Sequence, residues 1–328
     1  MELVPPAEKH EVILAAARLG DLVSLTKPRI TVNVVISAAT GIFLAPGHLG
    51  WVRTVVALLG TALVVGGANT LNCYVERDTD ARMWRTRNRA LAAGRLEPRE
   101  GLLLGLLLAL VAVPLLSLVL NPLTGFLALL ALVSYVWVYT PLKQKTPAAL
   151  LVGAVPGAIP PLLGWTAVTG HADLGGLLLF AVMFVWQLPH FLAITLYLKE
   201  DYARGGHRVM PLVRGEKLAR LHLLLWTLLL VPTSFSFVFF HLAGPVYAVT
   251  AAVLGAGFIV MALRGLKVQS GPENVRTARR IFHYSIVYML LLFGVLVADR
   301  RRPPLAASAA VATVVLQPAL GRVASPSR

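Results

Sequence analysis

Three oxygen-bearing side chains recur at four-residue intervals near the end of an apolar stretch: Asn72, Glu76 and Asp80. In an α-helix each four-residue step turns the side chain by only about 40°, so this spacing places all three on one helix face. Carboxylate and amide oxygens suit Mg²⁺, which commonly bridges one or two carboxylates to substrate phosphates. No histidine lies within residues 69–82, which argues against zinc. The column of side chains therefore favours an oxygen-ligated divalent cation.

A basic segment follows this column directly. Residues 82–89 contain four arginines, among them Arg85 and Arg89, which is more positive charge than the neighbouring acids need. Excess cations beside an oxygen-ligand metal site suit a diphosphate leaving group, because its charge must be neutralised as it departs. The competing interpretation is a solvated loop in which acids and arginines only form ion pairs. The start of the column inside an apolar stretch argues against that interpretation, because polar groups there need partners.

Two further polar segments are predicted on the same membrane side. Lys199 and Asp201 follow the apolar stretch 174–198, and Lys143 follows the stretch 123–139. Three polar loops would then meet at the mouth of one cavity. An ordinary positive charge in a cytoplasmic loop is the competing interpretation for each cation. Arginine matches phosphate geometry best, and the candidates to hold phosphate oxygens are Arg85, Arg89, Lys143 and Lys199.

His190 lies inside the apolar stretch 174–198, one helical turn after Trp186 and Gln187. Polar groups deep in a membrane span are candidates for function. Imidazole is also a common axial ligand of haem iron. The competing interpretation is a histidine that only hydrogen-bonds a neighbouring helix.

The elements that must position these residues are membrane helices. Of the 328 residues, 57% are apolar and only 14% are charged, whereas a soluble domain carries about 25% charged residues. The net charge is +15 and the mean hydropathy is +0.74. A basic nucleic-acid-binding protein is not this apolar, so we exclude nucleic acid as a partner. The single cysteine, Cys73, excludes a disulfide framework and a multi-cysteine metal site.

About 20 apolar residues cross the hydrocarbon core of a bilayer, and nine stretches of roughly this length are almost free of charge. They are residues 30–45, 51–75, 101–120, 123–139, 148–168, 174–198, 221–241, 245–263 and 281–298. This pattern predicts an all-α polytopic membrane protein with nine transmembrane helices. Gly153, Gly157 and Gly164 in the fifth stretch predict close helix packing there.

Basic residues indicate the orientation. The N-terminal arm and the even-numbered connections hold 24 lysines and arginines, whereas the odd-numbered connections hold one, Arg53. Cytoplasmic loops concentrate Lys and Arg, so we expect the N-terminus and the even-numbered loops in the cytoplasm, with the protein in a bacterial inner membrane. Three parts are expected: a cytoplasmic arm over 1–29, a nine-helix domain over 30–299 and a poorly ordered C-terminal tail over 300–328.

Taken together, these motifs resemble the UbiA superfamily of intramembrane prenyltransferases, over roughly residues 21–299. Within it, the match is to the haem-modifying branch. The matching pieces are the column with the following Met83-x-Arg85-Thr86-x-Asn88-Arg89, Leu25-Thr26-Lys27-Pro28-Arg29, Tyr139-Thr140-x-x-Lys143, Pro160-Pro161-x-x-Gly164-Trp165, Trp186-Gln187-x-Pro189-His190-Phe191, and Tyr284-Ser285 with Tyr288.

The resemblance implies a nine-helix bundle with a central cavity that opens to the cytoplasmic side and laterally to lipid. The implied reaction joins the farnesyl group of farnesyl diphosphate to a vinyl group of haem B, with addition of water, giving haem O and diphosphate for terminal oxidases. Mg²⁺ is the implied cofactor, and haem B and farnesyl diphosphate are the implied substrates. A haem A synthase or an oxidase assembly factor is the class of downstream partner that such a product implies.

The resemblance also implies roles for individual residues. Two departures from the wider superfamily matter: Glu76 stands where Asp is usual, and the second aspartate motif is reduced to Asp201 with Lys199 nearby. The second metal site thus lacks one of its usual two carboxylates. The implied metal ligands are Asn72, Glu76, Asp80 and Asp201, with Lys143 joining them as a catalytic residue; the implied diphosphate contacts are Arg85, Arg89, Lys143 and Lys199; the implied haem contacts are His190, Trp186 and Gln187.

Two alternatives stay open at this point. A related enzyme of the superfamily could prenylate an aromatic acid or a chlorin instead of haem. A protein of a different class, a membrane transporter, would be expected to place ionisable groups near the midplane and to show inverted repeats. Here the acids gather at one membrane edge, which favours the enzyme.

Overall fold

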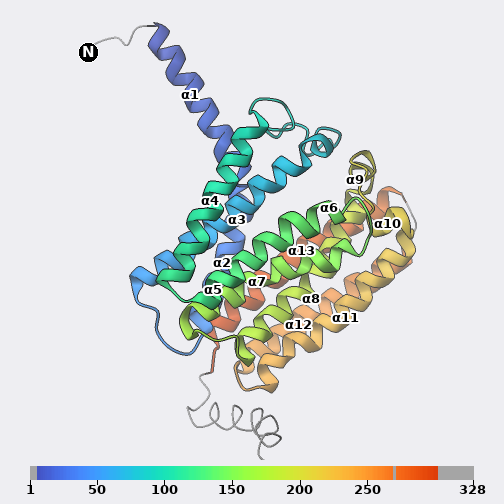
Figure 1. Cartoon of the computed structure of the whole chain (residues 1–328). Coiled ribbons are helices and arrows are strands. Elements are labelled where there is room, and N and C mark those ends of the chain that lie inside the picture. The colour runs from blue at the N-terminus through green and yellow to red at the C-terminus, as the bar shows by residue number, and fades with distance from the viewer. Residues whose placement is uncertain (1–5, 269–270, 302–328) are drawn as a thin grey trace, which may run out of the picture.

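The computed structural model describes residues 6–268 and 271–301 of the chain. Within these residues the chain forms a bundle of helices (Figure 1), and its β-structure is limited to one isolated bridge between Ala243 and Arg300. The helices are α1 (Pro6–Leu25), α2 (Pro28–Leu44), α3 (Trp51–Asp80), α4 (Pro98–Val119), α5 (Pro122–Val133), η1 (Ser134–Tyr139), α6 (Thr140–Leu142), α7 (Ala149–Thr169), α8 (Leu174–Tyr197), α9 (Lys199–Arg204), α10 (Met210–Val213), α11 (Glu216–Phe239), α12 (Pro245–Lys267) and α13 (Pro272–Ala298).

Eight membrane-length helical segments in the described residues are apolar enough to cross a bilayer, with α5, η1 and α6 counted as one. They correspond to the predicted stretches from residue 51 onward. The first predicted stretch, 30–45, corresponds to α2, an apolar helix of only 17 residues. The structure thus confirms the all-helical membrane fold, and the count of nine transmembrane helices stays a prediction.

The structure describes most of the predicted N-terminal arm but almost none of the predicted C-terminal tail. Most of the predicted N-terminal arm is the helix α1, which projects away from the bundle (Figure 1). The predicted C-terminal tail lies almost entirely outside the described residues, since these end at residue 301.

Helix α3 carries the predicted column and is longer than the apolar stretch that predicts it. It has 30 residues and continues beyond residue 75 to Asp80, so Asn72, Glu76 and Asp80 lie on one uninterrupted helix. The connection that follows ends at α4, which begins with a reciprocal capping box between Glu97 and Glu100. The basic segment is thereby held between two helices that pack against each other.

The predicted fourth span is not one regular α-helix. Residues Ser134–Tyr139 form a π-helix, η1, between α5 and α6. The backbone N–H of Thr140 donates to the carbonyl of Tyr135, five residues back, and the Thr140 hydroxyl donates to the same carbonyl at 2.8 Å. A π-helical turn takes in an extra residue and is frequent at functional sites. It therefore changes the direction in which Thr140 and Lys143 project relative to α5.

The glycines of α7 lie at helix–helix contacts, as predicted. A β-carbon at Gly153 would overlap the ring of Tyr139, and one at Gly157 would overlap the side-chain amide of Gln187. One at Gly164 would overlap a backbone carbonyl of α2. Glycine lets α7 approach η1, α8 and α2 closely, and α7 is the most buried of the membrane-length helices.

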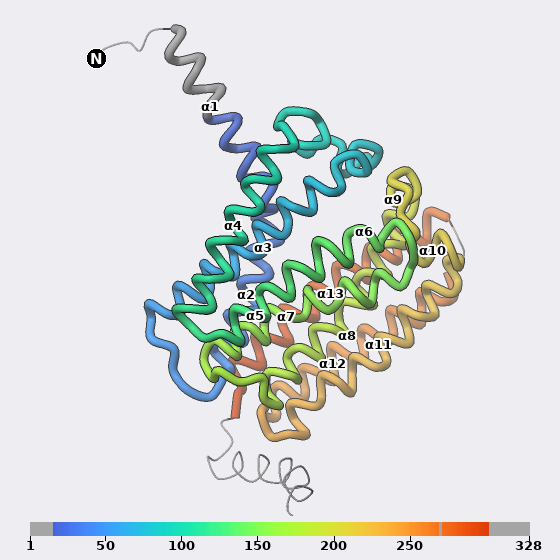
Figure 2. Tube along the Cα trace, viewed as in Figure 1, coloured from blue at the N-terminus to red at the C-terminus, as the bar shows by residue number. Residues whose placement is uncertain are grey.

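Two apolar clusters form most of the core. The larger cluster draws mainly on α8, α11, α12 and α13 and contains the fully buried rings of Tyr247 and Phe258. The second cluster draws on α3, α4, α5 with η1, and α7, and contains Leu71 and Leu116. In Figure 2 the larger set runs from yellow-green to red and the second set from blue to green, and α7 of the second set packs against α8 of the larger set. Helices of both sets line the cavity described next.

Candidate active site

A cavity of about 860 Å³ lies among α2, α3, α5, η1, α7, α8 and α13. This volume is typical of small-molecule and cofactor sites, which measure about 300–1,000 Å³. Most of its wall is apolar. Nine of the eleven predicted site residues line it: Asn72, Glu76, Asp80, Arg85, Arg89, Lys143, Trp186, Gln187 and His190.

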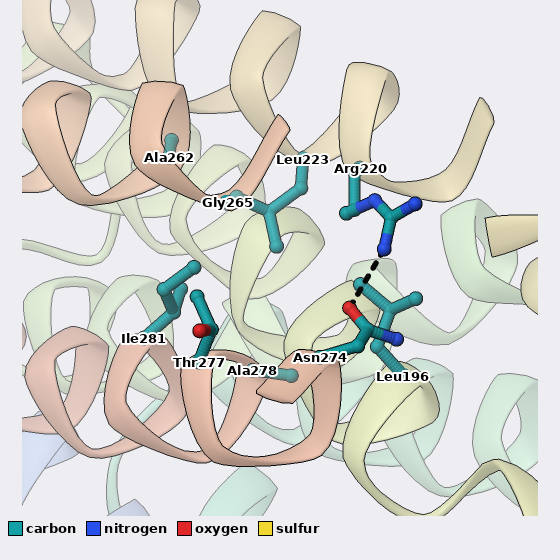
Figure 3. Close-up of a pocket in the computed structure, with 9 residues that line it drawn as sticks. All are labelled: Leu196, Arg220, Leu223, Ala262, Gly265, Asn274, Thr277, Ala278 and Ile281. Carbon is teal, nitrogen blue, oxygen red and sulfur yellow. Dashed lines mark hydrogen bonds between the residues drawn. The ribbon is translucent and has the colours of Figure 1, made fainter. Parts of the chain in front are cut away.

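A second pocket is far smaller. It has a volume of about 10 Å³ and lies between α8, α11, α12 and α13 (Figure 3). That is room for about one water molecule. No predicted site residue lines it, so the large cavity is the candidate active site.

The three side chains of the column face the cavity from α3, as their spacing predicts. Their exposed fractions are 1% for Asn72, 4% for Glu76 and 1% for Asp80. Asn72 Nδ2 donates to Glu76 Oε2 at 2.8 Å and to the Thr140 hydroxyl at 3.2 Å. The hydrogen bond from Asn72 to Thr140 joins α3 to the residue that follows the π-helix η1. Asp78, by contrast, points away from the cavity with 83% of its side chain exposed.

Each member of the column is paired with a cation from a different segment. Lys27 Nζ, between α1 and α2, donates to Asn72 Oδ1 at 2.8 Å. Lys143 Nζ lies 2.5 Å from Glu76 Oε1. Arg89 Nη1 donates to Asp80 Oδ2 at 2.5 Å. The mouth of the cavity therefore has three partly buried cations, each of which lies beside a side-chain oxygen of α3.

The column fits a divalent cation in its chemistry. Asp80 Oδ1 is buried and has no hydrogen-bond partner in the described residues, so one carboxylate oxygen is unused by the protein. All the donor atoms are oxygens, which Mg²⁺ prefers. The described part of the chain has no cluster of three or more His, Cys, Asp or Glu side chains. A metal ion here would thus complete its coordination with waters or substrate oxygens.

Lys27 is a residue whose importance was missed in the sequence, although it lies in one of the matched motifs. Its backbone is left-handed, with φ 50° and ψ 65°, which is uncommon for a non-glycine residue. Burial lowers the pKa of Lys27 to about 8. Lys27 is distinguished by its positive φ, its burial and its contact with Asn72. The local sequence predicts none of these three features.

The pKa of Arg89 is raised, whereas that of Lys27 is lowered. Burial acts to lower the pKa of its guanidinium, but the charge of Asp80, the hydrogen bond to Asp80 and the charges of other nearby groups together outweigh this effect, and the pKa is raised above its ordinary value. Arg89 therefore stays protonated as the partner of Asp80.

Asp201 does not line the cavity, although it was predicted as a metal ligand. Its carboxylate accepts the backbone N–H of Trp84 at 2.6 Å and that of Arg85 at 3.4 Å. Asp201 thus fastens the basic segment after α3 to α9. It is placed to position Arg85, whose side chain does line the cavity.

Lys199 is also outside the cavity lining. Its ammonium donates to Glu216 of α11 at 2.7 Å. Glu216 also accepts from Asn274 at 2.9 Å, and Asn274 accepts from Arg220 at 2.9 Å (Figure 3). Lys199 is therefore part of a polar network that joins α9, α11 and α13.

The predicted haem contacts lie together on α8. The rings of Trp186 and His190 are stacked, with centroids 4.7 Å apart, and Phe282 of α13 lies 4.8 Å from His190. Trp186 Nε1 donates to the carbonyl of Ser285 at 2.7 Å, and His190 Nδ1 lies 2.7 Å from the Ser285 hydroxyl. Both side chains are thus fixed against α13 at the cavity wall.

Gln187 has a mainly structural set of contacts. Its amide nitrogen donates to the carbonyls of Ala154 and Met183, each at 3.1 Å. Its oxygen packs where Gly157 leaves room. Gln187 therefore links α8 to α7, and only part of it reaches the cavity.

The fold and the site define a class: polytopic helical membrane proteins in which charged side chains lie at one end of a largely apolar cavity. The chain belongs to the UbiA prenyltransferase family, whose model matches residues 34–286.

Similar proteins include two with curated names. A protoheme IX farnesyltransferase of Anaeromyxobacter dehalogenans (strain 2CP-C) is 54% identical over 284 residues, which cover 87% of this chain and 95% of that protein. A protoheme IX farnesyltransferase of Myxococcus xanthus (strain DK1622) is 49% identical over 281 residues, covering 86% and 95%.

Solved structures share the fold at low identity. A structure of digeranylgeranylglyceryl phosphate synthase has a TM-score of 0.73 and 15% identity, covering 86% of this chain and 98% of that chain. A UbiA homologue from Archaeoglobus fulgidus bound to GPP and Mg²⁺ has a TM-score of 0.59 and 16% identity, covering 84% and 99%.

Proposed function

We propose that this protein is a protohaem IX farnesyltransferase that converts haem B and farnesyl diphosphate to haem O and diphosphate. Relatives at 49–54% identity over most of the chain carry that name. The structural observation that carries the proposal is the array of Asn72, Glu76 and Asp80 with their cations at the mouth of an apolar cavity. The same cavity has His190 in its wall.

Binding of the diphosphate exchanges partners at the mouth. Lys27, Lys143 and Arg89 turn from the α3 side chains toward the diphosphate oxygens, and Arg85 joins them. Asn72, Glu76 and Asp80 would then be free to hold Mg²⁺, which would supply Lewis-acid stabilisation of the leaving group. The bond between C1 of the farnesyl group and the diphosphate oxygen breaks, and its electron pair leaves with the diphosphate.

The apolar part of the cavity holds the farnesyl chain and the porphyrin. A vinyl carbon of haem B forms the new bond to farnesyl C1, and water adds to the resulting cation with loss of a proton. His190 is placed to ligate the haem iron. Trp186 stacks on the imidazole ring of His190. An apolar wall keeps other water away from the allylic cation.

The two predicted residues outside the cavity have different roles in this proposal. Asp201 positions Arg85 through the backbone of the basic segment. Lys199 supports the packing of α9 on α11. One metal site, on α3, is therefore part of the proposal, and Asp201 is not among its ligands.

We place the mouth of the cavity on the cytoplasmic side of a bacterial inner membrane. The strong excess of Lys and Arg in the arm and in the even-numbered connections supports this orientation. Farnesyl diphosphate would then reach the site from the cytoplasm and the bilayer.

The test is a product assay. Membranes with the protein are incubated with haem B, farnesyl diphosphate and Mg²⁺, and the extracted pigments are identified by mass spectrometry. The proposal expects haem B to gain one farnesyl group and one hydroxyl group, only when Mg²⁺ is present. A prenylated aromatic acid or chlorin in place of haem O would indicate another activity of the family, and no prenylated product from any acceptor would contradict the enzyme itself.

A further inference from the structure

The hydrogen bonds around Ser285 determine which nitrogen of His190 carries a proton. The Ser285 hydroxyl donates to the carbonyl of Phe282 at 2.6 Å, and a carbonyl oxygen can only accept. The single proton of the hydroxyl is thereby used. The contact of 2.7 Å between Ser285 Oγ and His190 Nδ1 must then be donated by the imidazole. His190 thus carries its proton on Nδ1.

The other nitrogen of the ring is available. In a neutral imidazole with a protonated Nδ1, Nε2 has the lone pair. His190 lines the cavity and is partly exposed, and Nε2 has no hydrogen bond in the described residues and is not among their buried, unpartnered atoms. Nε2 is therefore accessible and can act as a ligand.

Two aromatic side chains also contact the His190 ring. Trp186 stacks on one side at 4.7 Å and 23°, and its Nε1 donates to the backbone of Ser285 at 2.7 Å. Phe282 contacts the ring at 4.8 Å. Ser285 is fully buried, and its backbone and its hydroxyl thus fix the two aromatic side chains of α8.

We infer that Ser285 is a positioning residue that holds His190 with Nε2 directed at the haem iron. The inference rests on the proposed function, because it takes haem B as the substrate. A histidine that ligates a metal usually donates its other N–H to such an acceptor, and this hydrogen bond sets its orientation and basicity.

The test uses the full-length protein in detergent with ferrous haem B alone, so that no turnover is needed. Resonance Raman spectroscopy measures the iron–histidine stretch. We expect wild type to show this band and His190→Ala to lose it. In Ser285→Ala the band moves to lower frequency, and haem affinity falls about 10-fold, as for other changes in the groups that support a metal ligand. Ser285→Thr restores both.

Ser234→Ala is the matched control. Ser234 is another fully buried serine within the bundle, bonded to Tyr288 and to a backbone carbonyl of its own helix, and it does not line the cavity. We expect its spectrum to match wild type. The cysteine side chain of Ser285→Cys is close to serine in size but is a poorer hydrogen-bond acceptor for His190. This variant provides a second measurement of the iron–histidine band if Ser285→Ala is poorly folded.

An unchanged band in both Ser285→Ala and Ser285→Cys would overturn the inference, and so would a band that survives in His190→Ala. Haem O formation is measured separately on the same preparations. Wild-type protein that makes haem O without an iron–histidine band would keep the proposed function and reject the role of Ser285. A band that responds to Ser285 in a protein making no haem O would reject the proposed function alone.

Discussion

Lys143 Nζ lies 2.5 Å from Glu76 Oε1, although the two residues belong to helical segments far apart in the sequence. Glu76 is 5% exposed in its side chain and Lys143 18%, so the pair is largely removed from water. Breaking a buried pair by removing one partner leaves an uncompensated charge. We therefore expect the pair to separate only when a metal cation binds to Glu76 and an anion binds to Lys143 at the same time.

Metal and diphosphate should accordingly bind together. In wild type, Mn²⁺ as a probe should bind weakly alone and more tightly with inorganic diphosphate, by a factor of about 5–150 for a coupling of ordinary size. Lys143→Gln frees Glu76, so Mn²⁺ alone should bind more tightly and the effect of diphosphate should shrink. Electron paramagnetic resonance of free Mn²⁺ measures both. Lys145→Gln, an exposed neighbour, should behave as wild type. Equal Mn²⁺ affinity in Lys143→Gln and wild type would contradict the exchange of partners.

Asp80→Asn should nearly abolish haem O formation. The change removes one negative charge from the metal site and leaves Arg89 without its carboxylate partner. We expect a loss of roughly 10²–10³-fold in kcat, the scale of removing a group that stabilises transition-state charge. Asp78→Asn is the control, since Asp78 is exposed two residues away. Both proteins should insert into membranes normally, and full activity of Asp80→Asn would reject Asp80 as a metal ligand.

Asp201→Asn separates positioning from metal binding. The carboxylate holds two backbone N–H groups of the basic segment, so its loss should loosen Arg85. The expected result is a several-fold higher KM for farnesyl diphosphate with little change in Mn²⁺ affinity. Glu200→Gln, at an exposed neighbouring position, should change neither value. A large loss of Mn²⁺ affinity in Asp201→Asn would instead restore the second metal site predicted from the sequence.

Gly157→Ala should destabilise the bundle. Its β-carbon would overlap the Gln187 side-chain oxygen, which is held by its amide between α7 and α8. Overpacking of this kind costs about 1–3 kcal/mol, so the thermal midpoint in detergent should fall. Gly294→Ala is the comparison, because its β-carbon would meet nothing within 4 Å. The same midpoint for both variants would show that α7 and α8 can separate without penalty.

Much of the site can be predicted from spacing alone. The period of the α-helix places Asn72, Glu76 and Asp80 on one face whatever surrounds them, and the structure has them there. Close packing at the glycines of α7 is predictable for a similar reason, since a missing side chain leaves room for a neighbour.

Partners across the bundle are not predictable in this way. Lys199 and Lys143 both follow apolar stretches, yet one contacts Glu216 and the other contacts Glu76. The choice of partner for Lys199 depends on how α9 packs against α11 after α8 ends. No local sequence pattern specifies that packing. Lys27 is similar: its contact with Asn72 depends on a left-handed backbone that only the structure shows.

The π-helical turn at Ser134–Tyr139 sets a limit on how this protein can be re-engineered. Successive residues of a helix are separated by about 100° around its axis. If the same residues wound as an ordinary α-helix with no change in their number, Thr140 and Lys143 would be rotated around the helix axis by about one residue step, away from α3. Grafts and chimaeras between family members should therefore preserve the π-helical turn of this span, because regular α-helical winding of the same residues would separate Lys143 from Glu76.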